Sequence, residues 1–139
     1  MLANTKYKGL SGTNVSWDFV ELPSQILENW CYEKQTLELF ATHYKTGEVI
    51  PMELIDKIKA SATFHQGMQT LRQLSFSLLD MAWHGSDPSK ITSVKDFENN
   101  AFGDTVLYPD TPNTCMSTAF SHIFQGGYSA GYYLSLIHI

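Results

Sequence analysis

Apolar residues recur every three or four positions over most of this chain, a spacing that places them on one face of a helix. The first such helix is predicted from Trp17 to about Tyr32, and its apolar face consists of Phe19, Leu22, Ile26 and Trp30. A polar stripe that includes Glu21 runs beside this face. Pro23 lacks a backbone N–H and interrupts the pattern, so we expect a kink there or local compensation.

The same spacing predicts further helices downstream. Their ranges are about 33–45, 51–58, 63–84, 93–101 and 117–123. In the longest of them, the apolar face is predicted to contain Met68, Leu71, Leu74, Leu78 and Met81. Ser93 is a predicted N-cap, because its hydroxyl can accept a free backbone N–H of the first turn. The sequence shows no clear alternation of the kind strands have, so the fold class is mainly α.

Composition and charge narrow the functional classes. A chain of 139 residues with 43% hydrophobic residues is long enough for one folded domain with a core. The net charge of −5 and the interspersed charges argue against nucleic-acid binding, which usually shows a basic stripe. No run of about eighteen apolar residues indicates a membrane span. Cys31 and Cys115 stand far apart in the sequence, which indicates two reduced thiols. A single disulfide between them is the alternative that the sequence leaves open.

Glu21 is the first candidate for chemistry. It is flanked by the apolar Val20 and Leu22, and Pro23 is predicted to bend the helix just beyond it. A carboxylate beside such a bend is a reasonable metal ligand. Most acidic stripes on helices are nevertheless solvated surface, and the residues alone leave both interpretations open.

A second candidate segment surrounds Gly126-Gly127. It contains His122, Tyr128 and Tyr132, and the two tyrosines are spaced to project from one helical face. Tyrosine and histidine are neutral donors that can stabilise the oxyanion formed during peptide hydrolysis. The competing interpretation is a glycine turn beside an aromatic core helix.

Both segments resemble peptidase family M3, a family of zinc oligopeptidases. The resemblance is carried by Ser-Gly-Thr-Asn-Val-x-Trp-Asp-Phe-Val-Glu-Leu-Pro-Ser-Gln from Ser11, and by His-x-x-x-Gly-Gly-Tyr-x-Ala-Gly-Tyr-Tyr from His122. It implies that residues 1–133 are part of a zincin-like helical metallopeptidase catalytic domain. It also implies that Glu21 is the third ligand of one Zn²⁺ ion and that short peptides are the substrates. His122 and Tyr132 are then catalytic, and Gly126, Gly127 and Tyr128 bind substrate.

The other zinc ligands of the family come from a His-Glu-x-x-His helix roughly two dozen residues before the glutamate. None of the twenty residues before Glu21 is histidine. We therefore expect the two histidines, and the glutamate that acts as general base, in a missing N-terminal part of the same polypeptide. The chain alone is expected to lack peptidase activity, and a cytoplasmic location is expected for the whole protein.

The last six residues depart from the family pattern, which has a further tyrosine where this chain has Ser135. Leu134 to Ile139 is also what CTG TCT CTT ATA CAC ATC encodes, and this DNA resembles a widely used transposase sequencing adapter. We predict that residues 134–139 are adapter read-through and that the natural sequence runs to Tyr133 at this point.

Two alternatives to an enzyme stay open. One is a non-catalytic helical module that binds peptides or partners with the same glycine–tyrosine loop, and the other is a helical fragment without independent function. The run Leu79-Asp80-Met81 also resembles the family and is assigned a packing role. His84 is interpreted as a surface or cap residue, and spacing does not decide whether Arg72 pairs with Asp80 or Glu28.

Overall fold

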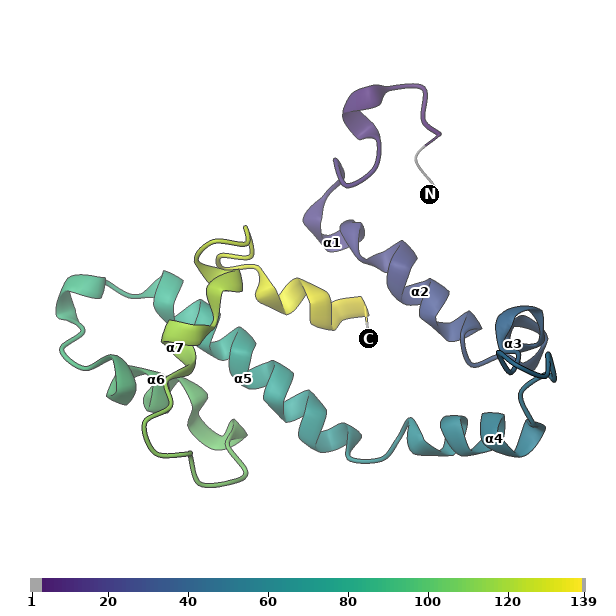
Figure 1. The fold of residues 1–139 in the computed structure, drawn as a ribbon. Coiled ribbons are helices and arrows are strands. Elements are labelled where there is room, and N and C mark those ends of the chain that lie inside the picture. The colour runs from purple at the N-terminus through teal and green to yellow at the C-terminus, as the bar shows by residue number, and fades with distance from the viewer. Residues whose placement is uncertain (1–3, 139) are drawn as a thin grey trace. The chain divides into compact units, whose positions relative to one another are not determined.

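The computed structural model describes residues 4–138, and this part of the chain is mainly α, as predicted (Figure 1). Its α-helices are α1 Trp17–Val20, α2 Leu22–Trp30, α3 Lys34–Phe40, α4 Met52–Ser61, α5 Gln66–Gly85, α6 Val94–Phe102 and α7 Met116–Ala119. Short 3-10 turns lie at Lys8–Leu10, Pro88–Lys90, Gly103–Thr105, Ser121–Ile123 and Tyr132–His138. The chain divides into two compact units, with the boundary between Phe64 and His65.

In the first unit, the helix predicted from Trp17 to Tyr32 is broken in two at Glu21. Glu21 is both the C-cap of α1 and the N-cap of α2. The cause is Pro23, which would clash with the carbonyl four residues earlier inside a continuous helix but is well tolerated in the first turn of a new one. The expected kink is therefore a complete break, and the backbone carbonyl of Glu21 accepts the N–H of Gln25 at 3.0 Å.

The next helix is shorter than predicted, because α3 ends at Phe40 rather than near Lys45. The following residues turn back instead, with a β-bridge between Thr42 and Val49. Gly47 makes this turn possible, since its φ of +73° is a left-handed conformation that glycine adopts without strain. The backbone groups that would have extended the helix are bonded across the turn.

Among the described residues of the first unit, Leu37 of α3 and Ile55 of α4 are the buried apolar side chains. An ion pair of 3.2 Å between Lys59 and Glu33 links α4 to the start of α3. Leu54, which precedes Ile55 in α4, is 46% exposed. Much of the apolar surface of this unit therefore faces outward.

In the second unit, α5 packs against α6, and α6 packs against α7. The prediction that Ser93 caps α6 is confirmed, because its hydroxyl accepts the N–H of Asp96 at 3.2 Å. Such a cap stabilises a helix by about 1 kcal/mol. Leu79, Phe120 and Ile123 form the buried apolar core of the described part of this unit.

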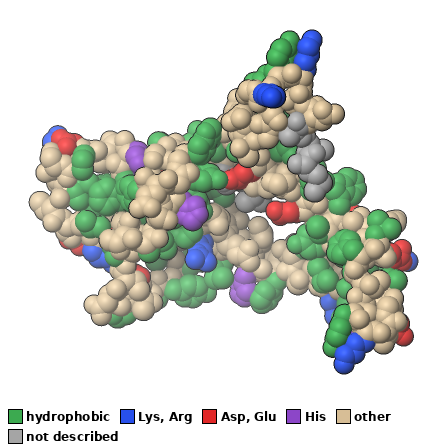
Figure 2. All heavy atoms as spheres, turned by 45° about the horizontal axis from the view of Figure 1, so that its top comes forward, with side chains coloured by type: hydrophobic (Ala, Val, Ile, Leu, Met, Phe, Trp, Pro, Cys, Tyr) green, Lys and Arg blue, Asp and Glu red, His purple; other side chains and the backbone are tan. Residues whose placement is uncertain are grey.

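The face of α5 that packs inward differs from the face that its apolar pattern predicts. Leu74, Leu78 and Met81 are 40–48% exposed, whereas the core side of the helix carries Leu79 and the polar Asp80. Periodicity identifies residues that share a face, but not which face is covered. Hydrophobic side chains are accordingly visible on the surface of the molecule (Figure 2).

Two further predictions from the sequence concern membrane-spanning helices and the last six residues. Across residues 4–138, no helix has the length and apolar character needed to cross a membrane. The prediction that residues 134–139 are read-through includes Ile139, which lies outside the described residues, and it stays a prediction.

Candidate functional site

The structure brings together the three ring-bearing residues that the sequence singles out near the C-terminus. The ring centroids of His122 and Tyr128 are 6.2 Å apart, those of Tyr128 and Tyr132 are 6.2 Å apart, and those of His122 and Tyr132 are 6.4 Å apart. The ring of Phe120 lies edge-on to Tyr132 at 4.7 Å and supports it from the core side. We call residues 122–132 the glycine–tyrosine loop.

Each of the two adjacent glycines, Gly126 and Gly127, is required for a different structural reason. A Cβ on Gly126 would lie 3.0 Å from the carbonyl oxygen of His122, so the backbone passes too close for a side chain without adjustment. That carbonyl accepts the N–H of Gly126 at 3.2 Å and of Tyr128 at 3.4 Å. Gly127 has a φ of +80°, which disfavours any residue with a side chain. Together they return the chain toward His122.

The two tyrosines do not share one helix, contrary to the geometry that their spacing predicts. Tyr128 lies in a turn, closed by a bond of 2.9 Å from the N–H of Gly131 to the carbonyl of Tyr128, and the final 3-10 turn begins at Tyr132. Ala130 has a φ of +54°, a left-handed conformation that is rare for a residue with a Cβ. The rings are neighbours because the turn is tight.

Asp80 is the residue of this region that sequence reasoning missed. Its carboxylate is fully buried and accepts the N–H groups of Ala130 at 2.9 Å and Tyr132 at 3.0 Å. Nδ1 of His84 lies 2.8 Å from Oδ1 of the same carboxylate. The prediction of His84 as a surface or cap residue fits its exposed position in the last turn of α5 and the 2.9 Å from its Nδ1 to the backbone carbonyl of Asp80. What the sequence does not predict is that the same nitrogen also contacts a buried carboxylate.

Residues of α5 also lie beside the rings of His122, Tyr128 and Tyr132, which we call the aromatic cluster. The hydroxyl of Tyr132 donates to Oε1 of Gln73 at 3.4 Å, and the ring of Phe76 lies 6.2 Å from that of Tyr132. The guanidinium of Arg72 lies over the ring of Phe76 at 5.4 Å. Arg72 is thus placed against an aromatic face, and it is Nδ1 of His84 that lies against the carboxylate of Asp80.

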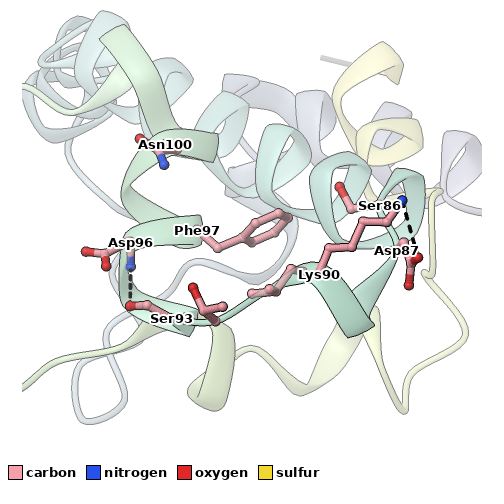
Figure 3. Close-up of a pocket in the computed structure, with 9 residues that line it drawn as sticks. Ser86, Asp87, Lys90, Ser93, Asp96, Phe97 and Asn100 are labelled. Atoms are coloured by element: carbon pink, nitrogen blue, oxygen red, sulfur yellow. Dashed lines mark hydrogen bonds and ion pairs between the residues drawn. The ribbon is translucent and has the colours of Figure 1, made fainter.

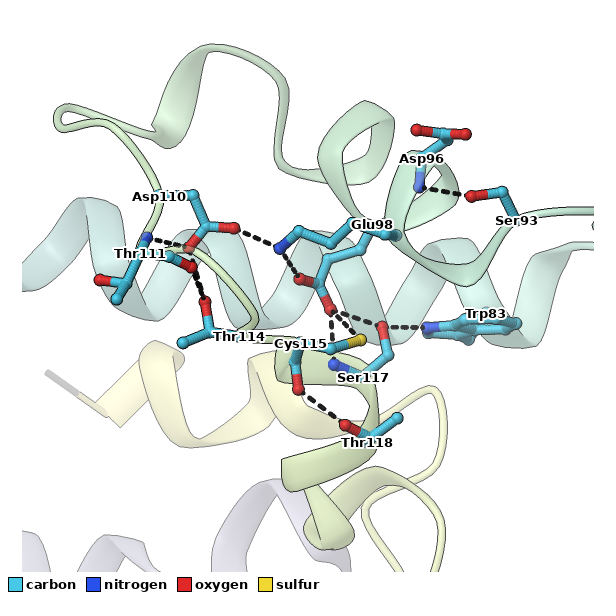
Figure 4. Close-up of polar contacts among 11 residues, drawn as sticks. Trp83, Ser93, Asp96, Glu98, Asp110, Thr111, Thr114, Cys115, Ser117 and Thr118 are labelled. Carbon is cyan, nitrogen blue, oxygen red and sulfur yellow. Dashed lines mark hydrogen bonds and ion pairs between the residues drawn. The ribbon is translucent and has the colours of Figure 1, made fainter.

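A second buried carboxylate fixes the segment that leads into the loop (Figure 4). Glu98 of α6 accepts the backbone N–H of Ser117 at 2.6 Å, the Ser117 hydroxyl at 2.8 Å and Nζ of Lys95 at 2.8 Å. Nε1 of Trp83 donates to the same hydroxyl at 3.1 Å. Burial opposes ionisation of Glu98, but these hydrogen bonds outweigh it and lower its pKa from 4.5 to about 2.

The second unit also contains two hollows. One, of about 430 Å³, lies where α5 ends and α6 begins and is lined mainly by polar side chains such as Asp87, Lys90 and Asp96 (Figure 3). The other, of about 880 Å³, lies beside α5 and is lined by residues that include Phe76, Glu98 and Leu107. Neither lining includes His122, Tyr128 or Tyr132, but the larger hollow shares Arg72, Gln73 and Phe76 with the surroundings of Tyr132.

Glu21 lies in the first unit, at the break between α1 and α2, and is half-buried. Its Oε2 accepts Nε2 of Gln25 at 3.2 Å, one helical turn further on. Within residues 4–138, no three His, Cys, Asp or Glu side chains are grouped so that they could hold a metal ion. A catalytic zinc site needs three protein ligands and an open position, so the described residues do not make a complete zinc site by themselves.

Comparisons of this sequence with a family model and with known proteins all point to the same family of peptidases. The sequence model of peptidase family M3 matches residues 1–137. Organellar oligopeptidase A, chloroplastic/mitochondrial, of Arabidopsis thaliana is 45% identical over 121 residues, which are 86% of this chain and 15% of that protein. Dipeptidyl carboxypeptidase of Escherichia coli is 41% identical over 138 residues, and oligopeptidase A of Salmonella typhimurium is 40% identical over 135 residues. These matches cover 98% and 96% of this chain, and it spans about a fifth or less of each relative's length.

Proposed function

Since this chain belongs to peptidase family M3, we propose that it is part of a zinc metallopeptidase that hydrolyses short peptides. The observation that carries this proposal is the gathering of His122, Tyr128 and Tyr132 around the glycine turn. The relatives are named as oligopeptidases and a dipeptidyl carboxypeptidase, which supports peptides as the substrate class.

In this proposal, His122 and Tyr132 donate hydrogen bonds to the oxyanion that forms when water adds to the scissile carbonyl. Neutral donors aimed at this developing charge stabilise the transition state more than the ground state. His122 is exposed and Tyr132 half-buried, which suits groups that must meet a substrate. Gly126, Gly127 and Tyr128 are proposed to bind the substrate, and the absence of side chains at the two glycines leaves the backbone accessible there.

Glu21 is proposed as one ligand of a single Zn²⁺ ion. The hydrogen bond from Gln25 supports this role, because metal-binding carboxylates are commonly oriented by such outer contacts. When bound, zinc supplies an activated water and a Lewis acid. The two histidine ligands and the general base are proposed to lie in another part of the same polypeptide, so the isolated chain is expected to bind zinc weakly and to be inactive.

We further propose that residues 1–133 are part of the catalytic domain, that residues 134–139 are read-through, and that the whole protein is cytoplasmic. One relative is named as a probable cytosolic oligopeptidase A, which supports the last point. Sequencing the source DNA on both sides of this reading frame tests the first two. An in-frame His-Glu-x-x-His upstream and a tyrosine-containing continuation after Tyr133 are expected.

The direct test is hydrolysis of a quenched fluorescent peptide by the complete polypeptide that contains this chain. We expect cleavage that a chelator abolishes and added zinc restores. Peptide binding without any cleavage would instead favour the alternative of a non-catalytic helical binding module. Cleavage that is insensitive to chelators would exclude the zinc mechanism.

A further inference from the structure

We propose that Asp80 is a positioning residue for the peptidase reaction, because its carboxylate holds the backbone of the glycine–tyrosine loop in the shape that presents Tyr128 and Tyr132. This inference rests on the proposed function. Asp80 does not belong to the aromatic cluster itself. It acts through the backbone of Ala130 and Tyr132, to which it is bonded.

The geometry of the contact is specific. The N–H groups of Ala130 and Tyr132 are two residues apart and converge on one carboxylate, Oδ1 accepting the first and Oδ2 the second. Backbone N–H groups that converge in this way form an anion-binding concavity. The N–H of Gly131, which lies between them, is bonded to Tyr128 instead, so each of these three consecutive donors has a partner.

The loop conformation needs such an anchor. Ala130 is held at a φ of +54°, and the left-handed region costs a residue with a Cβ roughly 1–2 kcal/mol. Strained conformations of this kind persist where surrounding contacts over-determine them. Of the two hydrogen bonds from the loop to Asp80, one comes from the N–H of Ala130 itself and the other from the N–H two residues further on, and together they supply that constraint.

The anchor is itself rigidly held. Asp80 follows Leu79, which is fully buried in the core, and it sits in the longest helix of the described chain. A buried carboxylate is costly unless its oxygens are paired. His84 supplies a partner at 2.8 Å from Oδ1, in addition to the two backbone donors. Both carboxylate oxygens of Asp80 therefore have partners, in the loop and in His84, which fits a residue whose role is to hold the loop in position.

The test uses Asp80→Asn in the complete polypeptide. An asparagine side chain has one acceptor oxygen, so its amide group must face one of the two backbone N–H donors and release it. We expect kcat on a quenched peptide to fall roughly ten- to a hundredfold, with a smaller change in KM, because displaced donors weaken the transition state more than substrate binding.

The matched control is Glu98→Gln, which changes an equally buried carboxylate that contacts Ser117 rather than the loop. Both variants are assayed well below their melting temperatures. We expect Glu98→Gln to lower the melting temperature while kcat stays near the wild-type value. Equal kcat values in the two variants would overturn the inference.

Hydrogen exchange separates this inference from the proposed function. In the complete polypeptide, Asp80→Asn is expected to speed amide exchange in residues 128–133, whereas Glu98→Gln is expected to speed it around Ser117. If the wild-type protein shows the protection but no peptidase activity, the proposed function fails and the anchoring stands. If Asp80→Asn leaves exchange in residues 128–133 unchanged, the anchoring is refuted.

Discussion

The carboxylate of Glu98 accepts both the backbone N–H and the hydroxyl of Ser117, at 2.6 and 2.8 Å. This pair joins α6 to the start of α7, and Trp83 adds α5 through its bond to the same hydroxyl. Ser117 is therefore a meeting point of three helices, a few residues before the glycine–tyrosine loop begins. Glu98 therefore holds the helices together at Ser117, whereas Asp80 bonds to the glycine–tyrosine loop itself.

Replacing Ser117 with alanine is expected to lower the free energy of unfolding by about 1–3 kcal/mol. The change removes a donor to Glu98 and leaves the indole N–H of Trp83 without its acceptor. Urea unfolding of the complete polypeptide measures this. Thr118→Ala is the control, because the exposed Thr118 hydroxyl bonds to the backbone carbonyl of Cys115 alone among the contacts described. Equal losses in both variants would contradict the account.

Stability is expected to depend on Glu98 in acid. Its pKa is lowered on folding from 4.5 to about 2, so the folded state holds its proton less tightly than the unfolded state. The contribution of Glu98 is therefore fully present above pH 4.5 and is lost as the pH falls from 4.5 through about 2, by on the order of 3 kcal/mol in all.

Urea unfolding between pH 6 and about 2.5 checks this, with Glu98→Gln as the comparison. The variant is expected to be less stable than wild type at pH 6 and to approach it as the pH falls. A constant difference between the two proteins across this range would show that ionisation of Glu98 does not stabilise the fold.

Gly127→Ala is expected to destabilise the loop by about 1 kcal/mol, since alanine is strained at a φ of +80°. Gly67→Ala in α5 is the control and is expected to change stability in the opposite direction, because an added Cβ there meets nothing within 4 Å. Alanine favours the helix at that position, so stability is expected to rise by up to about 1 kcal/mol. Thermal unfolding measures both, and a loss at Gly67 or a gain at Gly127 would contradict these backbone assignments.

The sequence predicts the helical class, the cap at Ser93 and a disturbance of the first helix at Pro23, because these depend on local chemistry. It predicts a kink at Pro23, where the structure has a complete break. It also identifies His122, Tyr128 and Tyr132 as residues that belong together, through their resemblance to a family motif. It does not predict the buried role of Asp80, since fifty residues separate Asp80 from Ala130 and no local pattern marks the contact. The exposed face of α5 was likewise missed, because an apolar stripe does not indicate what covers it.

Tyr132→Phe tests the proposed donor role. Removal of the hydroxyl is expected to lower kcat of the complete polypeptide about a hundredfold, with little change in KM, because the lost bond is made in the transition state. The neighbouring Tyr133 is exposed, and Tyr133→Phe is expected to leave kcat near wild type. Equal activity of the two variants would exclude Tyr132 as an oxyanion donor.

The central claim, that this chain contributes Glu21 to a zinc peptidase, is tested most directly by measuring bound zinc and peptide hydrolysis together in the complete polypeptide. Glu21→Gln is compared with Glu28→Gln, an exposed acid of α2, the helix that Glu21 precedes as N-cap. We predict that wild type and Glu28→Gln bind about one zinc ion and cleave the peptide, whereas Glu21→Gln loses zinc and at least about a hundredfold in rate. Full zinc content and full activity in Glu21→Gln would contradict the claim.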